Sequence, residues 1–274
     1  MKILVACDME GITGVTNWDQ VDPHHTEYPR FRRLMTGDVN AAVLGASEAG
    51  ADEILITDGH ERGANLLLEE LDQCAQLVCG EDSPLAMVQG IDQGIDGVIF
   101  VGYHARAGSQ NAILDHTWSS RRVANLWLND TLVGEYGLNG AVAGHFNAPV
   151  LMLTGDQTAC AQACELLGAI ETVVVKTALS RKAAICLPPQ VTEELIQRAA
   201  SLAVKRLQAG DAPKPFVIAS PVHVTIDFNS SDQADQAALL PGSKRVDGRR
   251  LTFTADDMLA AYYAFQAAIA MVSL

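Results

Sequence analysis

Residues 1–14 read MKILVACDMEGITG, and this stretch decides how the rest of the chain is interpreted. Residues 2–7 form an apolar run typical of a buried parallel strand, with polar residues only where the strand leaves its sheet. Asp8 and Glu10 lie two positions apart, so their side chains point the same way while the chain stays extended. Carboxylates placed together repel each other unless a cation lies between them, and divalent metals bind carboxylate oxygens readily. An acidic turn before a helix fits the same residues, so both interpretations stay open.

The composition is that of an ordinary globular protein. The chain has 274 residues, of which 49% are apolar and 19% charged, and this length suits one large or two modest α/β domains. It carries 19 basic and 33 acidic residues, a net charge of −14, and its basic clusters are no longer than Arg32-Arg33 or Arg121-Arg122. A nucleic-acid-binding protein needs a larger basic surface, so we expect no nucleic-acid partner.

The apolar runs and the cysteines indicate a cytoplasmic protein without a membrane partner. The opening apolar run is six residues long, too short for the hydrophobic region of a secretory signal. No apolar run approaches the roughly 20 residues of a membrane span. The six cysteines include no C-x-x-C pair, and we expect them to be reduced.

Strand and helix patterns alternate up to about residue 180, which predicts an α/β fold with a mostly parallel sheet and flanking helices. After the first strand, we expect strands at residues 53–57, 97–102, 149–154 and 171–176, helices at residues 28–49, 159–168 and 188–210, and a hairpin around Asn129-Asp130. The later part of the chain reads as a smaller α+β portion. We therefore expect a metal-binding α/β domain at residues 1–185 and a smaller α+β portion at residues 186–274.

Residues able to hold a metal recur where the predicted strands leave the sheet. Asp58 and His60 follow the second strand and His104 follows the third, just as Asp8 and Glu10 follow the first. Functional side chains of parallel sheets gather outside the carboxyl ends of the strands. Any one histidine also fits a buried structural role, but the recurrence at successive strand ends favours a shared site.

Further candidates lie near the same edge. Glu135 opens a helix soon after the predicted hairpin, His116 follows the third strand, and residues 17–30 read as a polar loop or lid containing His24 and His25. Carboxylates and imidazoles without thiolates fit catalytic zinc, manganese or iron better than a structural zinc held by cysteines. With several carboxylates available, one can bridge two ions, so a two-metal site fits the pattern.

Several motifs resemble those of the D-aminopeptidase family, the M55 class of zinc-dependent enzymes associated with dipeptide transport. The motifs are A-C-D-M-E-G-I-T-G at residues 6–14, D-G-H at 58–60, G-Y-H-A-R at 102–106, V-G-E-Y-G-L-N at 133–139, P-V-L-M at 149–152, V-K-T-A-L-S-R at 175–181 and D-M-L-A-A-Y at 257–262. The resemblance covers essentially the whole chain, and motifs of this length are specific.

The resemblance implies a dinuclear zinc aminopeptidase that removes N-terminal D-amino acids, such as D-Ala, from short peptides or amides. It implies metal ligands at Asp8, Glu10, His60, His104 and Glu135, with Asp8 bridging two zinc ions. Glu10 with His104 would complete one metal site, and His60 with Glu135 the other. Family members assemble as two stacked rings of five, so the resemblance also implies a homo-oligomer, a decamer.

The resemblance further implies a catalytic role for His116, although the stretch before it is one residue longer here and places Asp115 beside it. The family description treats this histidine as a nucleophile, whereas proton transfer is the role we prefer on physical grounds. Asp58 is expected to orient a ligand rather than to bind metal. Arg106 fits a substrate carboxylate and a salt bridge equally well.

Two other classes of function remain open at this stage. A metal-dependent phosphoesterase, or another amidohydrolase, would use a similar set of carboxylates and histidines. A phosphoesterase also needs cationic side chains to hold phosphate, and the predicted site offers mainly Arg106. A non-catalytic protein that binds a small molecule would be indicated if the chain held no metal.

Overall fold

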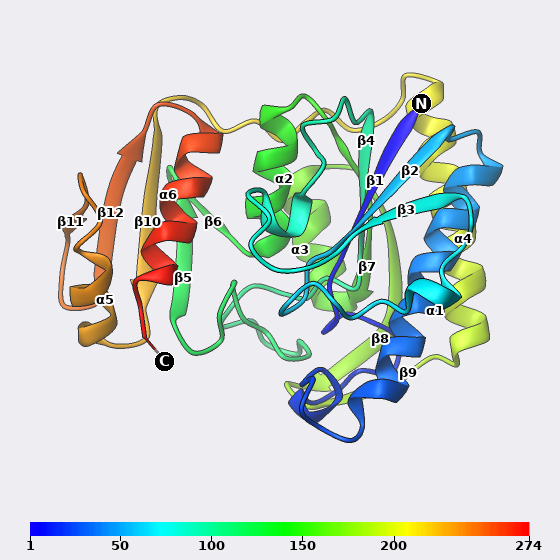
Figure 1. The fold of residues 1–274 in the computed structure, drawn as a ribbon, viewed down its shortest axis with the longest axis horizontal. Coiled ribbons are helices and arrows are strands. Elements are labelled where there is room, and N and C mark those ends of the chain that lie inside the picture. The colour runs from blue at the N-terminus through cyan, green and yellow to red at the C-terminus, as the bar shows by residue number, and fades with distance from the viewer. Residues whose placement is uncertain (274) are drawn as a thin grey trace.

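The computed structural model describes residues 1–273 and contains a seven-stranded sheet with helices on both of its faces (Figure 1). Its strands are β1 Lys2–Cys7, β2 Glu53–Asp58, β3 Ala75–Val78, β4 Gly97–Val101, β7 Val150–Asp156, β8 Glu171–Ser180 and β9 Ala183–Cys186. They lie in the order β3-β2-β1-β4-β7-β8-β9, and every pair is parallel except β8 with β9. The expected α/β class with a mostly parallel sheet is confirmed.

A second, five-stranded sheet is antiparallel throughout. Its strands are β5 Val123–Leu128, β6 Thr131–Val133, β10 Val222–Phe228, β11 Lys244–Arg245 and β12 Arg250–Ala255. The order is β11-β12-β10-β5-β6, so the predicted hairpin at Asn129-Asp130 joins two strands of this second sheet.

The helices have clear bounds and flank the sheets. They are α1 Tyr28–Glu48, α2 Glu135–His145, α3 Gln157–Leu167, α4 Pro189–Gln208, α5 Ser231–Ala237 and α6 Met258–Ala270, with short 3₁₀ turns η1 Trp18–Gln20, η2 Leu68–Glu70 and η3 Ala86–Val88. The long helices α1 and α4 pack against each other on one face of the first sheet, and α2 and α3 lie on the other (Figure 1).

Strand β1 is apolar because helices cover both faces of its sheet. Ile3 and Val5 pack in the core beneath α1 and α4, whereas Leu4 and Ala6 pack in the core shared with α2 and α3. All four side chains are fully buried. Neighbouring side chains of a strand point to opposite faces, so a strand buried on both faces shows a continuous apolar run instead of alternation.

The direction in which strands are added reverses between β1 and β4. From β1 the sheet continues through β2 to β3, and from β4 it continues through β7 to β8. Ligand sites of open α/β sheets lie at the carboxyl ends of the two strands that flank such a reversal. The fold therefore places the segments after β1 and β4 at the expected location of a functional site.

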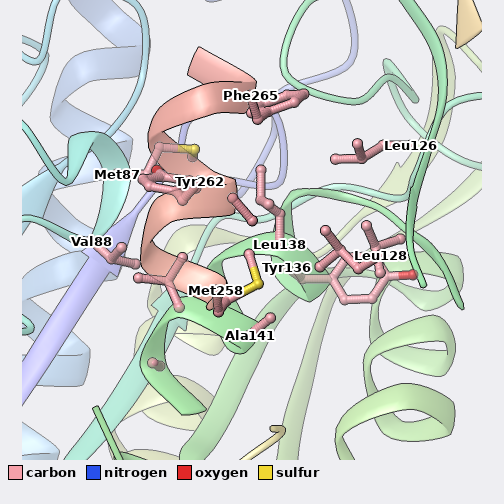
Figure 2. Packing of buried hydrophobic residues seen from close by; sticks show 14 of the residues in the cluster. Met87, Val88, Leu126, Leu128, Tyr136, Leu138, Ala141, Met258, Tyr262 and Phe265 are labelled. Atoms are coloured by element: carbon pink, nitrogen blue, oxygen red, sulfur yellow. The ribbon is translucent and has the colours of Figure 1, made fainter. Parts of the chain in front are cut away.

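The second sheet joins the first through a core that includes α2 and α6. Tyr262 and Phe265 of α6 share this core with Met87, and with Tyr136 and Leu138 of α2 (Figure 2). The Tyr262 hydroxyl also donates to the Leu85 carbonyl oxygen at 3.3 Å. This apolar contact holds the smaller sheet against the part of the chain that carries the site.

Sheet membership does not follow the predicted domain boundary at residue 185. Strands β5 and β6 come before that boundary and belong to the second sheet, whereas α4 comes after it and packs on α1 and β8. The two sheets therefore do not separate at residue 185, and the division into domains at residues 1–185 and 186–274 stays a prediction.

Two other features of the chain bear on its environment. All six cysteines carry free thiols, as expected. Within residues 1–273, the helices include none long and apolar enough to cross a membrane.

Candidate metal centre and active site

The predicted ligand residues converge at the carboxyl edge of the parallel sheet. Asp8 and Glu10 follow β1, His60 follows β2, His104 follows β4, and Glu135 is the first residue of α2. Each of these side chains is at least nine-tenths buried. The fold thus brings together five residues that lie far apart in the sequence.

The first group of ligand atoms surrounds His60. Its Nδ1 lies 3.3 Å from Asp8 Oδ1 and 3.2 Å from Glu10 Oε2. These three atoms are close enough together to hold one metal ion.

The second group surrounds His104. Its Nε2 lies 3.3 Å from Asp8 Oδ2 and 3.1 Å from Glu135 Oε1. His116 Nε2 lies 3.6 Å from the same Glu135 oxygen, and these atoms of His104, His116 and Glu135 also suit one ion. Asp8 therefore presents one carboxylate oxygen to each group, which is the arrangement that a bridging ligand requires.

The grouping of ligands differs from the pairing that the resemblance implied. Glu10 lies with His60, and His104 lies with Glu135, so the expected partners of the two acids are exchanged. Glu10 sits in a turn beyond the end of β1, where the alternation of an extended chain no longer sets the direction of its side chain.

Each of the three histidines donates its remaining ring N–H to a backbone carbonyl oxygen. The pairs are His60 Nε2 with Val21 O at 2.9 Å, His104 Nδ1 with Ala105 O at 3.0 Å, and His116 Nδ1 with Leu114 O at 2.8 Å. A carbonyl oxygen only accepts, so the proton lies on these nitrogens and the opposite nitrogens face the carboxylates. Metal-binding histidines are commonly fixed in this way.

Three buried atoms at the centre of the site have no hydrogen-bond partner among residues 1–273: Asp8 Oδ2, Glu10 Oε2 and His104 Nε2. Buried polar atoms without partners are costly and rare. A divalent cation in each ligand group would satisfy them, and nitrogen and oxygen donors without sulfur suit zinc, manganese or iron in a catalytic site. The residues present therefore fit a metal.

The close pairs shift the pKa values of the acids and the histidines. Burial alone would raise the pKa of Asp8, but His104 and His60 outweigh burial and hold it well below its usual range. Burial alone would lower the pKa of His60, but the nearby Glu10 and Asp8 carboxylates raise it well above its usual value. A cation at this site therefore competes with protons for the imidazole nitrogens.

His116 lies against both the second ligand group and the mouth of the site. Its ring stacks on His104 with centroids 3.9 Å apart and an interplanar angle of 9°. The edge of Trp18 contacts it from the polar loop at a centroid distance of 5.4 Å. The imidazole is therefore held between the metal ligands and a loop that borders solvent.

The loop that carries His116 has an unusual backbone. Leu114 and Trp118, two positions to either side, have φ angles of +49° and +61°, which bulky residues rarely adopt. The Trp118 N–H donates to Glu135 Oε1 at 2.7 Å and so fixes a ligand carboxylate. Such backbone conformations persist only where surrounding contacts impose them, and they are frequent at functional sites.

Asp115 anchors this loop, a role that was not predicted. Its Oδ1 accepts from Arg181 Nε at 2.7 Å, and its Oδ2 accepts from the backbone N–H groups of Gly108 and Ser109. Arg181 also donates to the Asp115 carbonyl oxygen at 2.8 Å. The sequence held one indication of this contact, namely the arginine that ends the motif at residues 175–181.

Asp58 lies outside both ligand groups, as expected. Its carboxylate accepts from the backbone N–H of Asn65, the side-chain amide of Asn65 and the backbone N–H of Leu66. The Asn65 amide also donates to the His60 carbonyl oxygen at 2.6 Å. Asp58 therefore supports a ligand through the loop that follows β2.

A cleft of about 900 Å³ opens over the ligand groups. Trp18, Val21 and His24 form part of its wall, so the polar segment at residues 17–30 lies at the site as expected. Within the described chain, Arg106 is not among the residues that line this cleft. The arginines that do line it are Arg62, Arg121 and Arg122.

Lys176 is a buried positioning residue that was not predicted. Its Nζ donates to the carbonyl oxygens of Glu10 and Ile12 at 2.6 and 2.7 Å, and the side chain is 1% exposed. Burial lowers the pKa of Lys176 to about 8. The sequence predicted a strand that ends at residue 176, whereas β8 continues to Ser180.

Replacing Lys176 by methionine is expected to weaken metal binding. The substitution removes the lysine donor from the Glu10 carbonyl oxygen, and it leaves the Ile12 carbonyl oxygen with only the Val15 N–H. The turn that carries Glu10 is then less firmly held, so we expect a loss of zinc affinity of roughly 10–100-fold. The measurement is a zinc titration of the metal-free protein, with exposed Lys182→Met as the matched control. Unchanged affinity in Lys176→Met would show that the lysine does not position the ligand.

A reversing parallel sheet with paired carboxylate and histidine groups at its carboxyl edge is typical of metal-dependent hydrolases. The chain belongs to the D-aminopeptidase family: the family model for the M55 peptidases, described as D-aminopeptidase, matches residues 1–267. The resemblance drawn from the motifs is thereby confirmed.

Two similar proteins cover nearly the whole chain. A D-aminopeptidase of Bacillus subtilis (strain 168) is 37% identical over 265 residues, which are 96% of this chain and 95% of the relative. A solved structure described as the Zn-dependent D-aminopeptidase DppA from Bacillus subtilis, a self-compartmentalizing protease, superposes with a TM-score of 0.95. It is 36% identical, with 99% of this chain and 97% of that chain covered.

Proposed function

We propose that this protein is a zinc-dependent aminopeptidase that hydrolyses N-terminal D-amino acids from short peptides or amides through a dinuclear metal site. The position of Asp8 is the observation that supports two metal ions, because one of its oxygens lies 3.3 Å from His60 Nδ1 and the other lies 3.3 Å from His104 Nε2. Glu10 and His60 would hold one zinc ion, His104 and Glu135 the other, and Asp8 would bridge them.

Bound zinc would polarise a substrate carbonyl group and lower the pKa of a coordinated water. The chain itself supplies His116, whose Nδ1–H is committed to the Leu114 carbonyl oxygen and whose Nε2 faces the site. That nitrogen suits proton transfer, so His116 would accept a proton there and return it to the leaving amine. His116 also lies within reach of the second ion, so a role as a third ligand is the competing assignment.

Membership of the D-aminopeptidase family favours peptide-bond hydrolysis over the phosphoesterase and the binding protein. The B. subtilis relative is described as Zn-dependent and self-compartmentalizing. We therefore extend to this chain both zinc as the metal and assembly into a homo-oligomer, with a decamer as the form that the family resemblance implies. The free cysteines fit a cytoplasmic location.

The experiment that tests this function is hydrolysis of D-alanine p-nitroanilide and its L counterpart, with added zinc and again after chelation. Cleavage of the D form should be abolished by the chelator and restored by zinc, with little cleavage of the L form. If the chain binds two metal ions but cleaves neither compound, the metal site would be supported and the proposed substrate would be wrong. Absence of bound metal would discard both.

A further inference from the structure

One wall of the cleft connects the proposed catalytic histidine to the second sheet. It comprises residues 118–122, which follow His116 and lead into β5. Its first residue donates its backbone N–H to Glu135, and its last, Arg122, donates its own to the Ser119 carbonyl oxygen at 3.1 Å. The Asn229 N–H in turn donates to the Arg122 carbonyl oxygen at 2.9 Å. The backbone at Arg122 is therefore fixed at both of its polar groups.

The Arg122 side chain is half-buried and unpaired within residues 1–273. Its Nε is buried without a hydrogen-bond partner, and its guanidinium forms no ion pair with any described residue. The other arginines of the cleft differ, since Arg62 approaches Glu81 at 3.4 Å and Arg121 is exposed to solvent. Arg122 is thus the cleft arginine whose unused hydrogen-bond donor is buried.

The negative charge of the cleft indicates what Arg122 could bind. Within the described chain, the cleft carboxylates of Asp22 and Glu61 belong to neither ligand group, so bound zinc would not compensate them directly, and the chain has a net charge of −14. A substrate that ends in a free carboxylate is repelled by such a surface unless a cation meets it. A guanidinium can bind a carboxylate through two parallel hydrogen bonds, which a lysine cannot reproduce.

We propose that Arg122 binds the C-terminal carboxylate of a short peptide substrate and thereby selects free peptides over their amides. This inference rests on the proposed function. A dipeptide spans about 7 Å when extended, so its carboxylate lies only a short distance from the scissile bond. Arg122 and His116 line the same cleft, and the turn at residues 119–122 directly follows the loop that carries His116.

The test compares D-Ala-D-Ala with its C-terminal amide in the zinc-loaded enzyme. The informative quantity is the ratio of kcat/KM for the free peptide to kcat/KM for the amide, because a general loss of folding or metal cancels in it. Arg122→Gln should lower this ratio by roughly 10–100-fold, the usual effect of losing a hydrogen-bonded charge pair, mainly through KM for the free peptide. Arg121→Gln, at the exposed neighbouring position, should leave the ratio unchanged.

The outcomes separate this inference from the function on which it rests. Equal activity of the parent enzyme on the peptide and its amide, or an unchanged ratio in Arg122→Gln, would overturn the role of Arg122 and leave the aminopeptidase intact. Cleavage of neither compound by the zinc-loaded parent would overturn the proposed function itself. If Arg122→Gln does not fold, Arg122→Lys serves instead, and it should lower the ratio to an intermediate value because it keeps the charge but loses the paired hydrogen bonds.

Discussion

Asp8→Asn is expected to lose at least one zinc ion per chain and to lower kcat/KM by roughly 10³-fold or more, equivalent to several kcal/mol. The reason lies in the two oxygens of the carboxylate, one beside His60 Nδ1 and the other beside His104 Nε2. An amide is neutral and offers a single oxygen acceptor, so it cannot serve both groups. The measurements are zinc content by elemental analysis and kcat/KM on D-alanine p-nitroanilide.

The matched control for this substitution is Asp22→Asn. Asp22 lines the same cleft but belongs to neither ligand group within the described chain, so its replacement should leave zinc content and activity near the parent values. Thermal unfolding of the metal-free variants checks that Asp8→Asn still folds, because the substitution also removes the carboxylate that faces two buried histidines. Full zinc content and full activity in Asp8→Asn would refute the bridging role.

Much of the parallel sheet was predictable because burial on both faces leaves a simple pattern. Strand β1 has the predicted bounds, and α1 ends within one residue of the predicted position, where Gly50 takes a φ of +94°. Strand β9 was not predicted. It lies at the edge of the sheet and exposes Ile185, and its four apolar residues are too short a run to distinguish a strand from other structure by periodicity.

The candidate site was likewise predictable only in part. Residues directly beyond strand ends, such as His60 and His104, are predictable because parallel strands end at one edge of the sheet. The grouping of Glu10 with His60 was not predictable, since it depends on how the chain turns after β1. Lys176 was missed for a related reason, because its role depends on contacts with a segment that lies far from it in the sequence.

His116→Ala is expected to lower kcat by about 10²–10⁴-fold while leaving two zinc ions bound per chain. The Nδ1–H of this imidazole is donated to the Leu114 carbonyl oxygen, so Nε2 is the atom available for proton transfer. Stacking on His104 and the edge contact with Trp18 hold the ring in one orientation. Removing the ring therefore removes a positioned proton acceptor, and the loss should fall on kcat more than on KM.

Zinc content decides between the two roles that the geometry allows for His116. The Nε2 atom lies 3.6 Å from Glu135 Oε1, so the histidine could complete the second ligand group instead of transferring a proton. A ligand role predicts that His116→Ala loses one zinc ion and that added zinc restores part of the activity. Proton transfer predicts full zinc content and no rescue.

His24→Ala is the matched control, since His24 lines the same cleft outside both ligand groups of the described chain. An unchanged kcat in His116→Ala would exclude both roles and leave the ring as packing between His104 and Trp18.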